Sequence, residues 1–159
     1  MREVRLLYSP AAGMVYSLRE LSTGEHGGAL SGAEGFAVGA QGLLMRAYYR
    51  LLPAVDILSP ADGALVAADE GGFRLRTGDG TEILVTLPGG AEYFLEAGQL
   101  ARAGEQVCRV SRDDFAAGKA GVAVCFCDSS QVTELNVLTG ARRAAAPAAE
   151  YSPQPWKGT

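Results

Sequence analysis

Several features that mark common protein classes are scarce in this chain of 159 residues. Positive charge is not in excess: the formal net charge is −4, which argues against a nucleic-acid binder because neutralising phosphates needs a basic face. No apolar run approaches the roughly 20 residues of a membrane span. The first eight residues contain no apolar signal-peptide core. We therefore expect a cytoplasmic protein that neither binds nucleic acid nor inserts into a membrane.

Cysteine and histidine are scarce as well. The three cysteines (Cys108, Cys125 and Cys127) are an odd and scattered set, which predicts reduced thiols rather than a disulfide framework. Cys125 and Cys127 share one side of a predicted strand, but two thiols without a nearby histidine are too few for a zinc site. His26, the only histidine, lies in a glycine-rich segment that is typical of solvated surface. The sequence thus predicts no metal site and no cofactor.

Residues 57–88 indicate the fold class most clearly. Apolar and polar residues alternate from Phe73 to Thr77, which is the period of a half-buried strand. Gly78-Asp79-Gly80 is typical of a tight hairpin turn. Residues 83–87 form a more continuous apolar run, as expected of a strand buried on both faces. With 21 glycines marking turns between short apolar runs, the chain is predicted to be all-β, an antiparallel β-sandwich or flattened barrel with a few short helices.

This order of segments resembles the glucose-type enzyme IIA domain of the bacterial sugar phosphotransferase system. The resemblance rests on the SPADG turn at 59–63, the two strands around the glycine turn, the EILV strand at 82–85 and the EAGQLARAG pattern at 96–104. It covers roughly residues 5–140. It implies a duplicated, hybrid-motif β-sandwich, and the SPAAG segment near the N-terminus, which echoes SPADG, agrees with such a duplication.

The resemblance also locates the site at which the family carries phosphate. Family members use one histidine as the carrier, and a second histidine lies beside it on the next strand. Gly71 stands at the first of these positions and Thr86 at the second, so neither imidazole is present. We expect the remaining binding face to consist of Glu34, Phe36, Phe73 and Thr86.

The chain departs from the family pattern by one insertion and by a shorter loop at 89–95, and the family's final strand is not found in its tail. An inserted helix is predicted at about 42–53, with its apolar residues largely buried against the sheet or, alternatively, against a partner: Leu43, Leu44, Tyr48 and Leu51. Residues 128–140 are predicted to form a third helix, after a short helix capped by Ser111 and a buried strand at 122–127. The Ala- and Pro-rich segment 144–159 is predicted to be a flexible tail, which leaves residues 1–143 as the domain.

Other chemistries found on similar sandwiches lack their residues here. The zinc peptidases of the lysostaphin type need two histidines, and biotin or lipoyl carriers need a lysine at a hairpin tip. No nucleophile-elbow or GK[ST] phosphate-loop motif occurs. Three hypotheses remain: a protein-binding or regulatory module that does not carry phosphate, a sugar-transport phosphocarrier whose displaced acceptor is His26, and a purely structural domain. The first is favoured, with phosphotransferase-system proteins as the implied partners.

Overall fold

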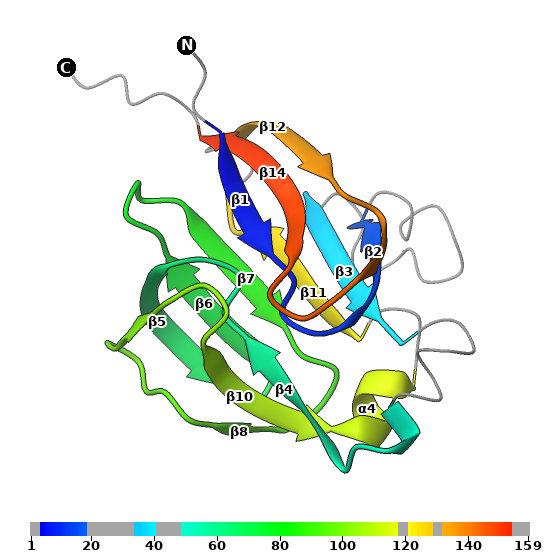
Figure 1. Ribbon diagram of the computed structural model, residues 1–159. Helices are drawn as coiled ribbons and strands as arrows, with labels where there is room; N and C mark the ends of the chain where they lie inside the picture. The colour runs from blue at the N-terminus through cyan, green and yellow to red at the C-terminus, as the bar shows by residue number, and fades with distance from the viewer. Residues whose placement is uncertain (1–3, 19–33, 41–48, 118–120, 129–131, 154–159) are drawn as a thin grey trace, which may run out of the picture.

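The computed structural model describes residues 4–18, 34–40, 49–117, 121–128 and 132–153. Antiparallel strands dominate these ranges (Figure 1). The strands are β1 (Arg5–Tyr8), β2 (Gly13–Ser17), β3 (Gly35–Gly39), β4 (Ala54–Leu58), β5 (Gly63–Asp69), β6 (Gly72–Arg76), β7 (Glu82–Thr86), β8 (Ala91–Tyr93), β9 (Leu100–Ala101), β10 (Gln106–Ser111), β11 (Val122–Phe126), β12 (Val132–Val137), β13 (Gly140–Arg142) and β14 (Pro147–Pro153). The helix α4 (Arg112–Ala116) follows β10, and its N-cap is Ser111, as predicted.

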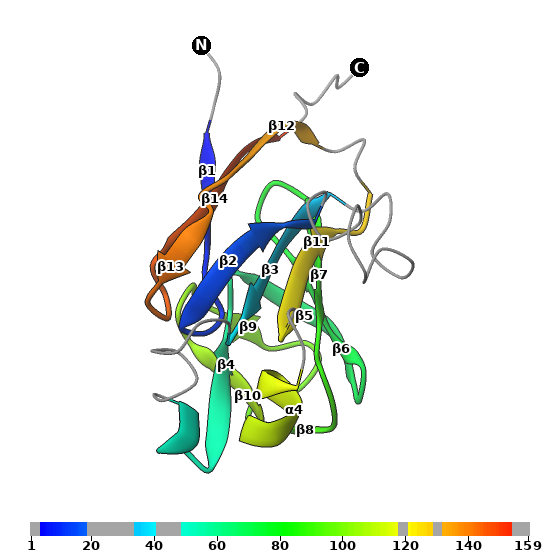
Figure 2. The ribbon, with the colours of Figure 1, turned by 90° about the vertical axis from the view of Figure 1, so that its right-hand side faces the viewer.

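The strands form three antiparallel sheets. One has eight strands in the order β13-β2-β3-β11-β7-β6-β5-β9, and two have three strands each, in the orders β1-β14-β12 and β4-β10-β8. Figure 2 shows β2, β3 and β11 side by side, with β1 and β14 in a separate layer beside them. Buried side chains from all three sheets form one main core, which includes Leu7, Val15, Phe36, Ile57, Leu65, Phe73, Ile83, Val107, Val124 and Tyr151. The predicted antiparallel β-sandwich is confirmed.

The fold consists of two equivalent halves, so each strand in one half of the large sheet has a counterpart at the same distance from the opposite end. From the ends toward the middle, β13 corresponds to β9, β2 to β5, β3 to β6 and β11 to β7. The small sheets correspond in the same way, β1-β14-β12 to β4-β10-β8. An approximate two-fold axis therefore passes between β7 and β11, which is the duplication that the repeated sequence motif predicted.

The SPAAG and SPADG segments hold the two halves together. The Tyr8 amide donates a hydrogen bond of 2.8 Å to the Pro60 carbonyl, and the Leu58 amide donates one of 2.8 Å to the Pro10 carbonyl. In both segments the serine hydroxyl donates to the carbonyl two residues later, at 2.6 and 2.7 Å. In each motif the serine hydroxyl bonds within its own turn, and the proline carbonyl accepts a bond from the residue that precedes the motif of the other half. The two halves are therefore interlocked.

Two segments differ from the sequence prediction. Residues 132–137 form β12 and not a helix, since the β-branched Val132, Thr133 and Val137 suit a strand and the segment pairs with β14. Residues 147–153 form β14, the central strand of its sheet, so the prediction of a flexible tail is wrong for this segment. The adjacent Ala148 and Ala149 are both buried, so the strand shows no alternation of apolar and polar residues by which the sequence could reveal it. Residues 154–159 lie outside the described ranges.

The predicted helical insertion is described only at its end. Tyr49 is 3% exposed; its hydroxyl donates to the Ala12 carbonyl, and its ring lies 5.0 Å from that of Phe115. Leu51 is 84% exposed, so the prediction that it is buried is wrong. Leu43, Leu44 and Tyr48 lie outside the described residues. No helix in the described ranges is long and apolar enough to cross a bilayer.

Candidate functional site

The structure brings Gly71 and Thr86 together. Strands β6 and β7 pair so that Gly72 lies opposite Thr86, and the Leu87 amide donates a 3.0 Å hydrogen bond to the Gly71 carbonyl. Thr86 is exposed, whereas its neighbour Val85 is fully buried in the core. Thr86 therefore belongs to the outer face of the eight-stranded sheet, which we define as the face turned away from the main core.

A hollow of about 290 Å³ lies on this outer face, over β6 and β7. We call it the Gly71–Thr86 hollow. It is lined by Ala67, Asp69, Gly71, Gly72, Phe73, Arg74, Leu84, Thr86 and Cys127. Both positions that correspond to the family histidines thus border one depression in the surface.

The other predicted site residues lie elsewhere. Phe36 is fully buried in the core, so the prediction that its side chain belongs to the binding face is wrong. Phe73 is 1% exposed and lines the hollow while its side chain packs in the core. Glu34 is not among the lining residues. Its carbonyl accepts a 3.0 Å hydrogen bond from the Phe126 amide, and under the two-fold axis Glu34 corresponds to Gly71.

The turn that enters β6 is held in place by side chains. Asp69 Oδ1 accepts hydrogen bonds from the amides of Gly71 at 2.8 Å and Gly72 at 3.1 Å. The Tyr93 hydroxyl lies 2.7 Å from the Asp69 carbonyl and 2.9 Å from that of Gly72. Burial raises the pKa of Tyr93, so this hydroxyl remains a donor at any physiological pH. The rim of the hollow is therefore a fixed structure.

Gly71 and Gly72 play different roles in this rim. A Cβ on Gly72 would lie 2.0 Å from the Val85 carbonyl oxygen, and its φ of +153° is one that L-residues rarely adopt. A Cβ on Gly71 would meet only Asp69 Oδ1, at 3.4 Å. Gly72 is thus required by the close approach of β7, whereas position 71 has room for a side chain that points over the hollow.

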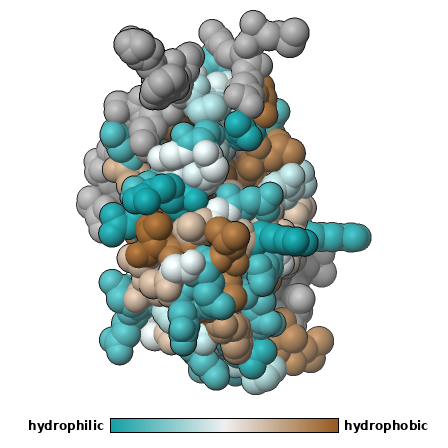
Figure 3. Space-filling view, turned by 90° about the vertical axis from the view of Figure 1, so that its left-hand side faces the viewer, coloured by the Kyte–Doolittle hydropathy of each residue, from teal (hydrophilic) through white to brown (hydrophobic). Residues whose placement is uncertain are grey.

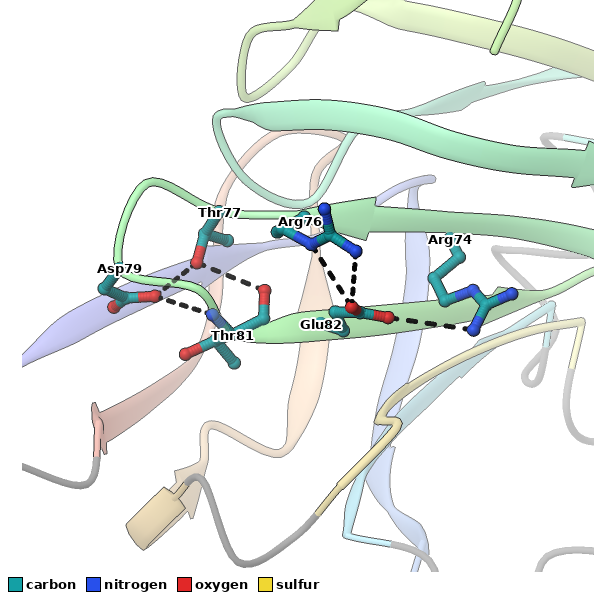
Figure 4. Close-up of polar contacts among 6 residues, drawn as sticks. All are labelled: Arg74, Arg76, Thr77, Asp79, Thr81 and Glu82. Carbon is teal, nitrogen blue, oxygen red and sulfur yellow. Dashed lines mark hydrogen bonds and ion pairs between the residues drawn. The ribbon is translucent and has the colours of Figure 1, made fainter. Parts of the chain in front are cut away.

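One wall of the hollow is charged. Arg76 donates two hydrogen bonds to Glu82, of 2.9 and 3.2 Å, and Arg74 forms an ion pair with the same carboxylate at 3.7 Å (Figure 4). Beyond them, Asp79 accepts hydrogen bonds from Thr77 and Thr81 in the hairpin turn. Since two guanidinium groups share one carboxylate, this wall keeps an excess of positive charge.

The thiols of Cys125, on β11, and of Cys127, just after that strand, are poor nucleophiles. Cys125 lies opposite Leu84 on the outer face, and Cys127 lines the hollow. Burial raises the pKa of the Cys125 thiol to about 11. Burial also raises the pKa of the Cys127 thiol, although the Arg74 guanidinium acts in the opposite direction. Both thiols therefore stay neutral at pH 7, and the described residues contain no group of three metal-ligating side chains.

The lining of the hollow offers few groups that could accept a phosphoryl group. None of the lining residues carries an imidazole. The Thr86 hydroxyl is a weak nucleophile without an adjacent base. The Asp69 carboxylate that lines the same hollow already accepts two amide hydrogen bonds through one oxygen. The arrangement offers a shaped depression with a mixed apolar and polar lining.

Sequence reasoning missed six lining residues: Ala67, Asp69, Gly72, Arg74, Leu84 and Cys127. We predicted a strand buried on both faces at 83–87, yet Leu84 is 37% exposed and Thr86 is exposed. The signal was the placement of Glu82 and Thr86 two residues on either side of Leu84, because alternate residues of a strand share a face.

The adjoining side of the molecule, which carries the β6–β7 hairpin, differs in character. Figure 3 shows that its apolar side chains gather in separate small areas divided by polar ones. This side also has a hollow, of about 560 Å³, which is lined by the hairpin residues Thr77 and Asp79 and by Leu6, a leucine that is 38% exposed.

Comparison with known proteins agrees with the fold. No protein-family model matches the chain, and no curated protein sequence matches it. Among solved structures, the chain is similar to the glucose permease IIA of Mycoplasma capricolum, with a TM-score of 0.70 and 20% sequence identity. The superposition covers 93% of this chain and 96% of that one. At this identity the likeness shows the fold, and the predicted glucose-type IIA fold is confirmed.

Proposed function

We propose that this chain is a protein-binding or regulatory module on a glucose-type IIA scaffold, and that it does not carry phosphate. One observation supports the proposal above all. The two positions that correspond to the family histidines border one hollow, but they are a glycine and a threonine. The hollow is present at the position of the family's phosphate acceptor, but the imidazole that takes the phosphate in the family is absent from it.

The same hollow supports a binding role. Leu84 is 37% exposed beside it, and the rim is fixed by Asp69 and Tyr93. A preformed depression with an adjacent apolar side chain suits the docking of a protein, since little ordering is needed on binding. The proposed partners are components of the phosphotransferase system. All three cysteines are free, which agrees with a reducing compartment such as the cytoplasm.

Phosphate transfer is tested by intact mass. The full chain is incubated with phosphoenolpyruvate and the general phosphotransfer proteins, and its mass is measured without acid treatment. The proposal predicts an unchanged mass. A gain of one acid-labile phosphate, mapped to His26, would establish the alternative of a phosphocarrier with a displaced acceptor.

Binding is tested with the histidine-containing phosphocarrier protein, by titration followed with calorimetry or NMR. Leu84→Asp should abolish the interaction because it places a charge beside the hollow. Leu100→Asp is the matched control, because Leu100 is 77% exposed and lies on β9, the edge strand of the sheet. If the parent chain binds neither this protein nor other phosphotransferase components, the purely structural role is the better account.

A further inference from the structure

We infer that the outer face around the Gly71–Thr86 hollow associates with the same face of a second copy of this chain, forming a weak two-fold dimer. The inference deepens the proposed function, because the second copy occupies the face proposed for protein binding. It also goes beyond it, since self-association needs no other protein.

The charges along β6 are self-complementary. Two carboxylates precede the strand, Asp69 at the end of β5 and Glu70 in the turn, and the strand continues into Arg74 and Arg76. These two guanidinium groups share the single carboxylate of Glu82, which leaves one positive charge in excess. Glu70 lies in the turn two residues before Gly72, and Arg74 lies on β6 two residues after it, about 7 Å along the strand. A two-fold axis across β6 near Gly72 reverses the direction of the second copy. It therefore places the acidic turn of each copy over the arginines of the other.

The shape of the face is self-complementary as well. Gly72 and Thr86 form a cross-strand pair that projects little from the sheet, so two copies can approach closely along this line. Leu84 and the space over Gly71 lie on opposite sides of that line. The proposed axis brings the exposed Leu84 of each copy toward the hollow of the other, and every contact is made twice, as a two-fold interface requires.

The size of the face sets the expected affinity. The exposed part covers about three to four strands spaced about 4.8 Å apart and about five residues of about 3.3 Å each, or roughly 300 Å² in projection. Stable dimers bury about 800 Å² from each partner. The dimer is therefore expected to be weak, with a Kd on the order of 10 µM to 1 mM.

The test is sedimentation equilibrium of the full chain from about 10 µM to 1 mM, at low and high salt. The inference predicts a monomer–dimer equilibrium that weakens as salt rises, since exposed charge pairs are screened. Glu70→Lys and Arg74→Glu should each weaken self-association at least fivefold. An equimolar mixture of these two variants should form a heterodimer, because each supplies the charge that the other now needs.

Two further variants, one in the hollow and one outside it, test the contribution of shape to self-association. Gly71→Leu fills the hollow without a backbone clash, because a Cβ there meets only Asp69 Oδ1, and it should reduce dimer formation. Leu100→Ser, on the edge strand β9 and outside the residues that line the hollow, should leave it unchanged. Circular dichroism checks that each variant is folded.

A chain that stays monomeric at 1 mM would overturn the inference, and so would a dimer that is indifferent to both charge reversals. These failures are distinct from those of the proposed function. A strict monomer that still takes no phosphate and still binds a phosphotransferase protein leaves that function intact, whereas phosphorylation of the chain removes it without affecting self-association.

Discussion

Replacing Gly72 with alanine should destabilise the chain strongly, and replacing Gly71 should not. The added Cβ at position 72 would lie 2.0 Å from the Val85 carbonyl oxygen, whereas real Cβ contacts stay above 3.0 Å. Strands β6 and β7 would have to separate by about 1 Å, at the centre of the large sheet. Backbone strain costs about 1–3 kcal/mol, and each weakened ladder hydrogen bond costs about 1 kcal/mol more. We therefore expect a loss of about 3 kcal/mol in the free energy of unfolding.

Such a loss is a large part of the roughly 5–15 kcal/mol that stabilises a domain. A domain of this size loses about 2–4 °C per kcal/mol, so the Tm should fall by about 6–12 °C in a thermal melt followed by circular dichroism. Gly71→Ala is the matched control and should stay within about 0.5 kcal/mol of the parent. The two-fold axis adds a third variant: a Cβ on Gly35 would lie 2.0 Å from the Val124 carbonyl oxygen, so Gly35→Ala should cost about as much as Gly72→Ala. If Gly72→Ala melts like the parent, or Gly71→Ala loses as much, the reasoning is refuted.

Three other changes test single features of the fold. Leu51→Asp should change the free energy of unfolding by less than about 0.5 kcal/mol in a urea titration, because this side chain is 84% exposed; a loss of several kcal/mol would contradict the structure. Ala145→Gly should raise the Tm, with a gain of about 0.5–1 kcal/mol, since Ala145 has φ of 68° and the equivalent turn of the other half has glycine, Gly104, at φ of 85°; an unchanged or lower Tm would argue against the equivalence of the turns. Burial raises the pKa of Asp79, but hydrogen bonds from the hairpin threonines and the charge of Arg5 together lower it by more. The folded-state pKa of Asp79 therefore lies below 3.8. A lowered folded-state pKa stabilises the fold above the unfolded value and ceases to do so as pH falls through the folded value. Asp79→Asn should therefore be less stable than the parent at pH 7, with a gap that closes on acidification below pH 3.8, and a gap that is constant with pH would exclude this linkage.

The fold was largely readable from local patterns, but the faces of the strands were not. The glycine turn at 78–80 predicted a hairpin, because such turns depend on nearby residues alone. The duplicated sandwich was implied by the family resemblance, with which the repeated SPAAG and SPADG segments agree. The run Ile83-Leu84-Val85 looked uniformly apolar and was assigned to a strand buried on both faces, although Glu82 and Thr86 mark the outward face on which the exposed Leu84 lies. The alanines of β14 were misread for a related reason. Small side chains give no hydrophobic period, and their burial depends on the sheet that they join.

The candidate site was predictable where its residues lie on one hairpin and was not where they come from distant segments. Alignment with the family placed Gly71 and Thr86, whose juxtaposition follows from one antiparallel hairpin. The contribution of Cys127 depends on the register of β11 against β7, which brings together residues about 40 positions apart. No local signal in the sequence encodes that register.

The central claim is that the scaffold of a phosphate carrier is present while its acceptor is missing, and one measurement tests it most directly. The double variant Gly71→His with Thr86→His is incubated with phosphoenolpyruvate and the general phosphotransfer proteins, beside the parent, and both are analysed by intact mass. The control variant, Glu34→His with Cys125→His, places two histidines at the equivalent positions across the two-fold axis, away from the family site. The account predicts one acid-labile phosphate on the first variant and none on the parent or the control. A phosphorylated parent, or a double variant that takes up no phosphate while remaining folded and binding the phosphocarrier protein, would contradict it.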